Sequence, residues 1–555
     1  MSKLIFLLIL TLSALINFKI YFDGYQHILI FFWLLTIISL FFTIKKKFNP
    51  VFFRMKIRLK RLLLITLILL PVIVRVVNYN LTRIHTDDLI TAYFSATYNF
   101  KTNNFFSGIP TDKSQWVSQF PSTYFILQKL FFILFGESLL TIKLSVLPYV
   151  YVTSIFLFLT GREIFGGKTA SIAIIIYSYI AISLYLETLG LHFISSTAVF
   201  NVFFYYAIKW HKYNSSWHAV ITGISCGFCY LFYTTSYIAL PFLIILCLYQ
   251  LYRFPMLLTV KNIILSLFAF IIVLSPFITH SLRFENYFLS RIKQVFLING
   301  EWSGYREEIE QGITTVSKVL SNNFAQTVQS LYSDNIGGQG GYTFSNLALL
   351  EKTSQLLILF GLLILLLFYI KKPEILFILL VILFSFTGMV FSIPPPAFHR
   401  FSLTFPYLAL VASIPFHFIF QLKQIPRSFS ILLSITVLLI YIYANQNYFI
   451  RGTINEISRK ELGMGLFINS NFPNRNLYIA SFPGFSYEKI YYFIPGKNAK
   501  SIRTDYHDRF LNNFNRKEKY LYILIYPEEF SSDFQQADPR GRIFNYTDDY
   551  SLFVN

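Results

Sequence analysis

The sequence has 555 residues, of which 55% are hydrophobic and 19% aromatic, and its formal net charge is +20. Its apolar residues form long runs instead of alternating stripes, so we exclude a soluble globular protein and predict an all-α polytopic membrane protein. Lys and Arg gather in the short loops between these runs, where the positive-inside rule places them. Membrane topology therefore explains much of the charge, and we exclude a nucleic-acid partner.

Apolar runs of about twenty residues predict about thirteen transmembrane helices. They lie at roughly 3–22, 27–44, 61–79, 142–160, 168–186, 192–208, 216–231, 235–252, 261–280, 353–370, 374–391, 402–422 and 428–446. The first run lacks a small-residue cleavage site, so we interpret it as a retained anchor and not as a signal peptide. The basic clusters all fall on one side if the N-terminus is cytoplasmic. We therefore expect a multi-pass protein of the cytoplasmic membrane with large outer loops at 80–141 and 281–352.

One apolar run, at residues 121–136, is not counted as a span. Counting it would move the basic residues Arg162 and Lys168 to the outer side. We expect it to form an interfacial helix instead, with Gln128 and Lys129 reaching water.

The chain divides into three parts. Residues 1–60 hold two transmembrane helices and a basic cytoplasmic loop, and residues 61–446 form the main transmembrane domain. In residues 447–555, polar loops surround short β-type runs, which predicts a small extracytoplasmic α/β domain.

Two adjacent acids, Asp87 and Asp88, directly follow a predicted span at the start of the first outer loop. Thr86 is a suitable N-cap, and Leu89 and Tyr93 continue an apolar helical spacing, so the acids fall in the first turn of a short helix. Acids in a first turn also simply favour the helix dipole, which is the structural alternative. Because an active site at the membrane surface is expected in this loop, we take the pair as candidate catalytic residues.

Several further motifs make residues 60 to 450 resemble the GT-C membrane glycosyltransferases, which use lipid-phosphate sugar donors. The motifs are His85 to Asp88 with Tyr93, the run from Pro121 to Gly136, Thr141 to Ser145 around Lys143, Gly161 to Gly166, and His399-Arg400 followed by Pro406. They are similar, in this order, to motifs of the protein O-mannosyltransferases and of the aminoarabinose transferases that modify lipid A. The second acid is Asp where the family usually has Glu.

The resemblance implies a GT-C-like catalytic domain at 61–446 and transfer of a monosaccharide from a polyprenyl-phosphate donor to an acceptor hydroxyl at the extracytoplasmic face. In this scheme Asp87 is the general base, and Asp88 either binds the acceptor or pairs with a cation such as Lys143. A single displacement would invert the anomeric configuration. The acceptor can be a protein, a lipid or a glycan, and the sugar stays open.

Cations must stabilise the departing lipid phosphate, and the resemblance implies Lys143, Arg400 and His399 for this role. Arginines and lysines at span ends also reach lipid headgroups without any other function. We interpret the basic residues Arg283, Arg291 and Lys293 of the second large loop as a solvated face on anionic lipid, although they could close over the phosphate.

Candidate contacts to the sugar or acceptor are His85, Tyr93, Trp116 and His192. No metal-ligand spacing such as HExxH is present to support a divalent metal between the acids and a histidine. We therefore expect catalysis that requires no metal and no other cofactor.

Three other protein classes remain as alternatives. A secondary transporter would have inverted repeats and midplane charges, but no internal repeat is evident and most charges lie at span ends. An en bloc glycan transferase or polymerase would carry a Trp-Trp-Asp-Tyr-Gly string, which the sequence lacks. A receptor held by a membrane anchor would not need so many spans.

Overall fold

The structure is a computed structural model. It describes residues 2–23, 26–44, 59–82, 86–100, 103, 105–108, 116–119, 121–283, 290–334, 342–344, 347–393, 397–453, 459–481, 500–503, 519–525, 531–546 and 550–555.

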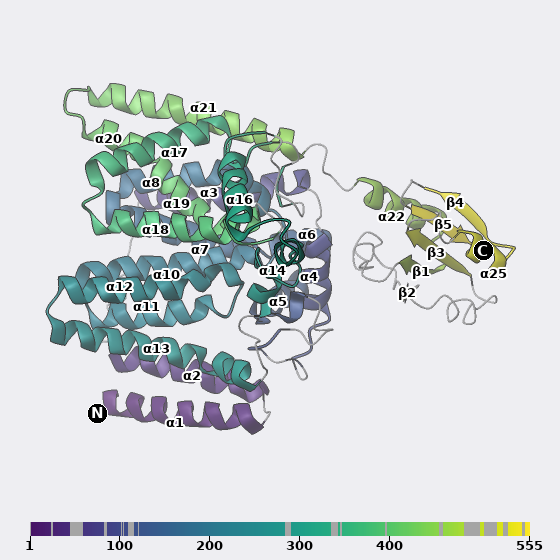
Figure 1. The fold of residues 1–555 in the computed structure, drawn as a ribbon, viewed down its shortest axis with the longest axis horizontal. Helices are drawn as coiled ribbons and strands as arrows, with labels where there is room; N and C mark the ends of the chain where they lie inside the picture. The colour runs from purple at the N-terminus through teal and green to yellow at the C-terminus, as the bar shows by residue number, and fades with distance from the viewer. Residues whose placement is uncertain are drawn as a thin grey trace.

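Long helices, packed side by side, form most of the molecule (Figure 1). In the first half of the chain these are α1 (Ser2–Asp23), α2 (Gln26–Ile44), α3 (Leu59–Asn78), η1 (Tyr79–Leu81), α4 (Thr86–Ala96), η2 (Trp116–Ser118), α5 (Thr123–Phe135), α6 (Leu139–Leu144), α7 (Leu147–Phe165), α8 (Gly167–Tyr179), α9 (Ala181–Leu186), α10 (Phe193–Tyr213), α11 (Ser216–Cys229), η3 (Thr234–Ile238), α12 (Ala239–Arg253) and α13 (Met256–Arg283). They are followed by α14 (Ser290–Val295), α15 (Tyr305–Glu310), α16 (Val316–Ser330), α17 (Lys352–Ile364), the π-helical turn η6 (Leu365–Tyr369), α18 (Pro373–Val390), η7 (Phe398–Thr404), α19 (Phe405–Ala412), α20 (Ile414–Gln421), α21 (Arg427–Thr453), α22 (Arg459–Asn471) and α25 (Ser531–Ala537).

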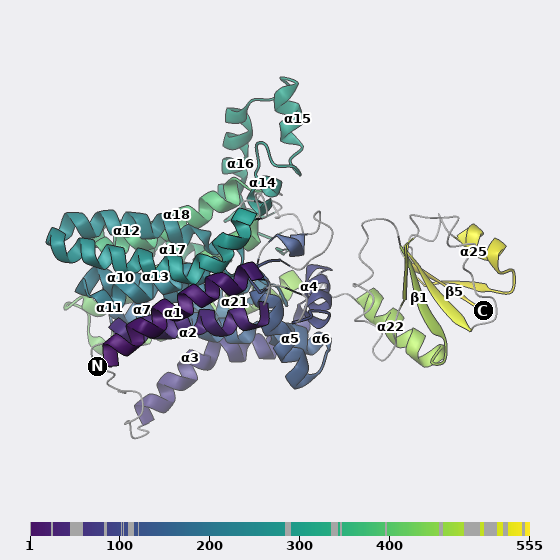
Figure 2. The ribbon, with the colours of Figure 1, turned by 90° about the horizontal axis from the view of Figure 1, so that it is seen from below.

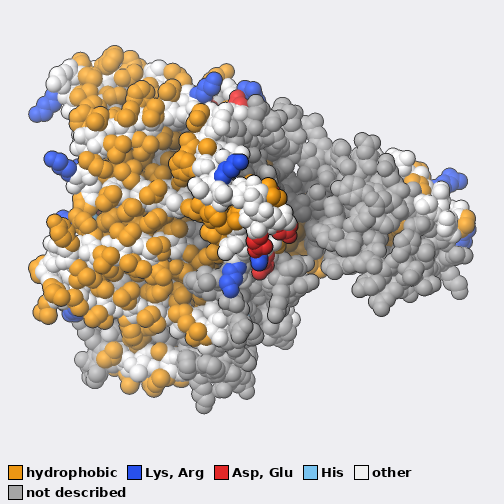
Figure 3. Space-filling model, viewed as in Figure 1, with side chains coloured by type: hydrophobic (Ala, Val, Ile, Leu, Met, Phe, Trp, Pro, Cys, Tyr) orange, Lys and Arg blue, Asp and Glu red, His pale blue; other side chains and the backbone are white. Residues whose placement is uncertain are grey.

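Every predicted span overlaps one of these helices, so the helical membrane fold is confirmed. Among the described residues, eight helices are long and apolar enough to cross a membrane: Leu62–Leu81, Leu139–Phe165, Thr234–Arg253, Met256–Leu282, Lys352–Tyr369, Pro373–Val390, Phe398–Gln421 and Arg427–Thr453. Apolar side chains cover the visible face of the bundle, and Lys and Arg lie toward its ends (Figure 3). A total of thirteen spans remains a prediction.

Several predicted spans are divided between successive helices, among them those at 402–422 and 168–186. The span at 402–422 is divided into η7, α19 and α20, where Pro406 and Pro415 occupy the first turns of α19 and α20 and lack the N–H groups that would continue the preceding helix. The span at 168–186 is divided into α8 and α9 at Ile180, whose backbone leaves the helical region (φ −56°, ψ 110°) without a proline. The second interruption separates α8 from α9, and α9 contacts η7.

Helix pairs in the bundle approach closely at small residues. A Cβ added to Gly223 on α11 would lie 2.0 Å from the Ser266 carbonyl oxygen on α13, so only glycine fits at this crossing. The N-terminal hairpin of α1 and α2 packs on α13 and α11, where the Trp33 indole donates a hydrogen bond of 2.9 Å to the Val273 carbonyl. The first two helices are therefore part of the packed bundle.

Helices α4, α5, α6 and α14 gather at one end of the bundle (Figure 1), and α15 and α16 project from it (Figure 2). The prediction that Gln128 of α5 reaches water was wrong, whereas Lys129 is half-buried. Gln128 is buried and hydrogen-bonds with Ser95 (2.7 Å) and Ser145 (3.0 Å), and Lys129 donates to the carbonyls at the end of α4. These polar contacts fix α4 against α5, because a buried amide must find partners.

The C-terminal part has a five-stranded sheet of order β2-β1-β3-β5-β4, made of β1 (Asn476–Ser481), β2 (Lys500–Arg503), β3 (Tyr520–Ile525), β4 (Arg542–Asn545) and β5 (Tyr550–Val554). β1 is parallel to β2 and β3, whereas β5 is antiparallel to β3 and β4. Alternating residues of β3 face opposite sides. Leu521 packs on one side with Met464 of α22, and Tyr522 on the other with Phe534 of α25. The predicted small α/β fold is confirmed.

Candidate active site

The acidic pair lies in the first turn of α4, as predicted. Consecutive helix residues point about 100° apart, so the two carboxylates face different surroundings. The Asp88 side chain is 1% exposed, while Asp87 is only half-buried and borders a cavity. Of the two acids, Asp87 is the one among the described lining residues of the cavity, whereas Asp88 is buried.

The cavity beside Asp87 holds about 110 Å³ and is enclosed by segments that are distant in the sequence. Four of the predicted site residues line it, namely Asp87, His192, His399 and Arg400. Its other lining residues are Phe193, Tyr233, Arg291, Val295, Trp302, Tyr342 and Ile393. The start of α4 thus meets the start of α10, the second outer loop and the start of η7.

Two arginines give the cavity its charge. The Arg400 guanidinium contacts His399 Nε2 at 3.4 Å and hydrogen-bonds with the Tyr233 hydroxyl. Arg291 donates to Gln294 Oε1 at 2.8 Å, and its guanidinium lies 5.0 Å from the centre of the Trp302 ring. Because both arginines have neutral hydrogen-bond partners, two positive charges face one Asp87 carboxylate. The site favours an anionic ligand.

Tyr342, from the second outer loop, closes the cavity over Asp87. Its phenol donates a hydrogen bond to Asp87 Oδ2, and its ring centre lies 4.4 Å from that of His399 and 5.9 Å from that of Phe193. Burial and the neighbouring carboxylate raise the pKa of Tyr342 well above its ordinary value, so the phenol keeps its proton. Asp87 thus accepts a hydrogen bond from a protonated hydroxyl in this structure.

A second cavity of about 210 Å³ shares Arg291, Val295 and Arg400 with the first. Its walls come from η3, α14 and α18 and are mainly apolar, with Ile238, Ile292, Phe296, Phe384 and Phe391 beside the small residues Thr234, Thr235, Ser385, Gly388 and Ser392. The two cavities therefore meet at the two arginines. Together they suit a molecule with a charged head and an apolar tail.

Lys143 lies on the other side of α4, in α6. Its ammonium group donates to the Tyr79 carbonyl (2.8 Å), the Thr82 carbonyl (2.7 Å) and the Thr82 hydroxyl (2.8 Å). The buried Asp88 carboxylate acts electrostatically on the same ammonium group. Lys143 is not among the described residues that line either cavity, so its contacts hold the segment that precedes the acids.

The sequence matches no protein-family model, and no curated protein matches it significantly. Among solved structures, the chain is similar to ArnT from Cupriavidus metallidurans bound to undecaprenyl phosphate, with a TM-score of 0.56 at 11% identity over 89% of this chain and 98% of that chain. The apo form of ArnT gives a TM-score of 0.55 at 11% identity, over 90% and 98%. The oligosaccharyltransferase of Archaeoglobus fulgidus is less similar, with a TM-score of 0.49 at 13% identity over 88% and 71%.

This chain has the GT-C fold. The fold of membrane glycosyltransferases that the sequence resemblance implied is thus confirmed. Identities this low show the fold alone, so the reaction has to be argued from the residues of the site.

The remaining predicted site residues lie elsewhere in the GT-C fold or outside the described part. Tyr93 packs in a small apolar cluster between α4, α5 and α6, and it is not among the described lining residues of the cavity. His85 and the side chain of Trp116 lie outside the described residues. In the part that the structure describes, no three His, Cys, Asp or Glu side chains form a group that could hold a metal ion.

Sequence reasoning missed Tyr233, Trp302 and Tyr342, and it placed Arg291 on a solvated face. Arg291 is half-buried and borders both cavities, because α14 packs against the end of α18 and turns this residue inward. The only signal was the amphipathic character of the loop. Tyrosines are too frequent here, at 38 in the chain, for any one of them to stand out in the sequence.

Proposed function

We propose that this protein is a membrane glycosyltransferase that moves a monosaccharide from a polyprenyl-phosphate donor to an acceptor hydroxyl at the extracytoplasmic face. One observation carries the proposal: a carboxylate that already accepts a hydrogen bond from a hydroxyl lies in the same small cavity as two arginines without acidic partners among the described residues. Displacement of a phosphate by a hydroxyl requires a base for the hydroxyl proton and a site for the phosphate anion, and this cavity has residues for both.

In the proposed reaction, the acceptor hydroxyl takes the place of the Tyr342 phenol at Asp87. Its oxygen attacks the anomeric carbon while Asp87 removes the proton, and the bond from that carbon to the phosphate oxygen breaks. The phosphate oxygen keeps the electron pair, and Arg291 and Arg400 stabilise its charge. Since the attack is a single displacement, the anomeric configuration inverts.

The donor lipid fits the second cavity in this proposal. Its phosphate would lie between the two arginines and its first apolar units against the walls from η3 and α18. The solved ArnT structure with undecaprenyl phosphate supports a polyprenyl phosphate as the ligand class. The acceptor, which can be a protein, a glycolipid or a surface glycan, remains open.

The test is transfer of radiolabelled sugar from synthetic polyprenyl-phosphate donors by membranes that contain the wild type, Asp87→Asn or Arg400→Gln. We expect Asp87→Asn to lower the rate of transfer by at least about 100-fold, because a positioned general base typically contributes a rate factor of about that size or larger. We expect Arg400→Gln to raise the donor KM at least tenfold. Glu310→Gln is the matched control, because Glu310 is an exposed acid whose one ion pair among the described residues is with Arg306 in the same projecting helix.

Protein levels must be equal across the variants. Undiminished transfer by Asp87→Asn would disprove the base assignment. Absence of wild-type transfer with a broad panel of donors and acceptors would disprove the proposed function.

A further inference from the structure

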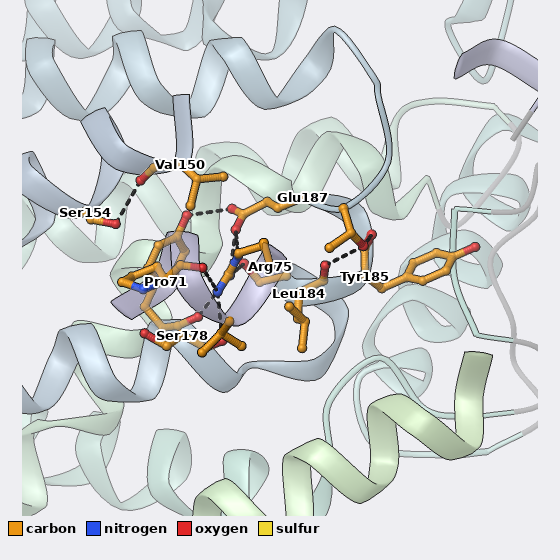
Figure 4. A network of polar contacts seen from close by, with 12 residues as sticks. Pro71, Arg75, Val150, Ser154, Ser178, Leu184, Tyr185 and Glu187 are labelled. Carbon is orange, nitrogen blue, oxygen red and sulfur yellow. Dashed lines mark hydrogen bonds and ion pairs between the residues drawn. The ribbon is translucent and has the colours of Figure 1, made fainter. Parts of the chain in front are cut away.

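A buried ion pair joins Arg75 of α3 to Glu187, the residue that follows α9. Both Nε (3.0 Å) and one terminal nitrogen (2.6 Å) of Arg75 donate to Glu187 Oε2, and the Tyr177 hydroxyl donates to Oε1 at 2.6 Å. Figure 4 shows the two charged side chains pointing toward one another. The Arg75 side chain is fully buried and that of Glu187 is 3% exposed. Ionisable residues at this depth are costly and need a reason to be there.

The guanidinium also caps an interrupted helix. Its remaining donors bind the Ser178 carbonyl (2.8 Å) and the Tyr177 carbonyl (3.3 Å), which the break at Ile180 leaves without helical partners. On the other side of the break, the Ala181 N–H donates to Asn445 Oδ1 at 3.4 Å. The break between α8 and α9 is thus built into the fold, and it turns the end of α9 toward α3.

Each partner leads into a different wall of the cavity. Arg75 lies twelve residues before Asp87, and the carbonyls of Tyr79 and Thr82 between them are held by Lys143. The ion pair and the lysine therefore hold the end of α3 at two points before the acid.

The other partner precedes the opposite wall. Glu187 lies five residues before His192, and the intervening Gly190 carbonyl accepts a 2.8 Å hydrogen bond from the Tyr124 hydroxyl. A Cβ on Gly190 would lie 2.3 Å from Ile142, so this segment is pressed against α6. The segment that follows Glu187 is therefore held against α5 and α6.

We infer that the Arg75–Glu187 pair is a positioning element that sets the distance between the Asp87 carboxylate and the wall that carries His192. The inference rests on the proposed function. Neither residue is among the described residues that line the cavity, so the pair acts through the two segments it joins. A displacement of about 1 Å at a reacting group is enough to slow a reaction by about 100-fold.

The experiment compares purified, monodisperse wild type with Glu187→Gln and Tyr177→Phe. Glu187→Gln keeps the size of the side chain but leaves the buried Arg75 charge without its counter-charge. Tyr177→Phe is the milder variant, because it removes one hydrogen bond to Glu187 and leaves both charges paired. The control is Glu163→Gln, which breaks an ion pair of 2.6 Å with Lys209, sixteen residues further along α10 than Phe193.

We expect kcat per folded protein to fall at least tenfold in Glu187→Gln and about threefold to tenfold in Tyr177→Phe. The donor KM should stay within about twofold, and Glu163→Gln should keep the wild-type kcat. A second signature is non-additivity: Arg75→Gln combined with Glu187→Gln should lose no more turnover than the worse single variant, because residues that act as one unit do not add.

A purely structural pair would lower the yield of folded protein and its thermal midpoint but leave kcat per folded protein unchanged. That result in both Glu187→Gln and Tyr177→Phe would overturn the inference alone. If the wild type shows no transfer, the proposed function falls and this inference falls with it. The two failures are therefore distinguishable.

Discussion

Tyr342 offers the sharpest test of the site, because its phenol hydrogen-bonds to the oxygen of Asp87 that an acceptor hydroxyl would need in the proposed reaction. A hydrogen bond to a charged group contributes about 1.5–3 kcal/mol. If the acceptor must first displace the phenol, its apparent affinity is reduced by about 10- to 150-fold. Tyr342→Phe keeps the ring that packs on His399 and removes only the hydroxyl.

We therefore expect Tyr342→Phe to lower the acceptor KM by about tenfold or more, with the donor KM unchanged. Water should also reach Asp87 more easily, so release of free sugar from the donor without any acceptor should rise. Both quantities come from one assay, in which transferred and free radiolabelled sugar are separated and counted. Tyr332→Phe is the control, since Tyr332 is a 59% exposed tyrosine of the same outer loop.

The opposite outcome would refute this reasoning. If Tyr342→Phe raised the acceptor KM or lowered kcat by tenfold or more, the phenol would assist the reaction instead of occupying the place of the acceptor. The contact with Asp87 would then be part of the catalytic arrangement.

Two further predictions concern the surroundings of the site and the C-terminal domain. Lys143→Met removes one ammonium group from three oxygens of the segment before the acids and should cost about 2–4 kcal/mol of stability. The thermal midpoint of this variant should fall while its donor KM stays the same. A tenfold higher donor KM at wild-type stability would contradict this and would indicate that Lys143 binds the proposed donor phosphate. In the C-terminal domain, hydrogen bonds from Arg540 lower the pKa of Asp538 to about 2, so the stability it contributes is complete above pH 4 and is lost as the pH falls toward 2. Hydrogen exchange of the β3 and β5 amides should become faster as this stability is lost. Asp538→Asn should abolish the part of the pH dependence that this carboxylate causes.

The long apolar helices were predictable from the sequence, because a bilayer forces each crossing to satisfy its own backbone within a long apolar run. The break at Ile180 was not predictable, since no proline or glycine marks it. The groups that satisfy it, from Arg75 and Asn445, lie more than 100 residues away from it in either direction. A helix interruption that depends on distant side chains leaves no local trace in the sequence.

The site residues also divide into those that the local sequence indicates and those whose place depends on distant contacts. Asp87, His192, His399 and Arg400 each lie at the start of a helix or helical turn on one side of the bundle, and topology alone brings such ends together. Arg291 and Tyr342 come from the large second outer loop, whose path is fixed only by contacts with the finished bundle. Lys143 was expected at the phosphate because of its position in a motif, but its ammonium group is directed to the end of α3 instead.

Five of the described basic residues separate into two kinds by their partners. Arg75 is neutralised by Glu187, and Lys129 and Lys143 bind carbonyl oxygens at helix ends, where the helix dipole favours positive charge. Arg291 and Arg400 contact only neutral side chains among the described residues, and both border the cavity of Asp87. A charge with little access to water is stabilised chiefly by an opposite charge. An anionic ligand would give these two arginines the counter-charge that Glu187 gives Arg75. The partners of the basic residues, more than their number, therefore support these two arginines as the binding site of the proposed donor phosphate.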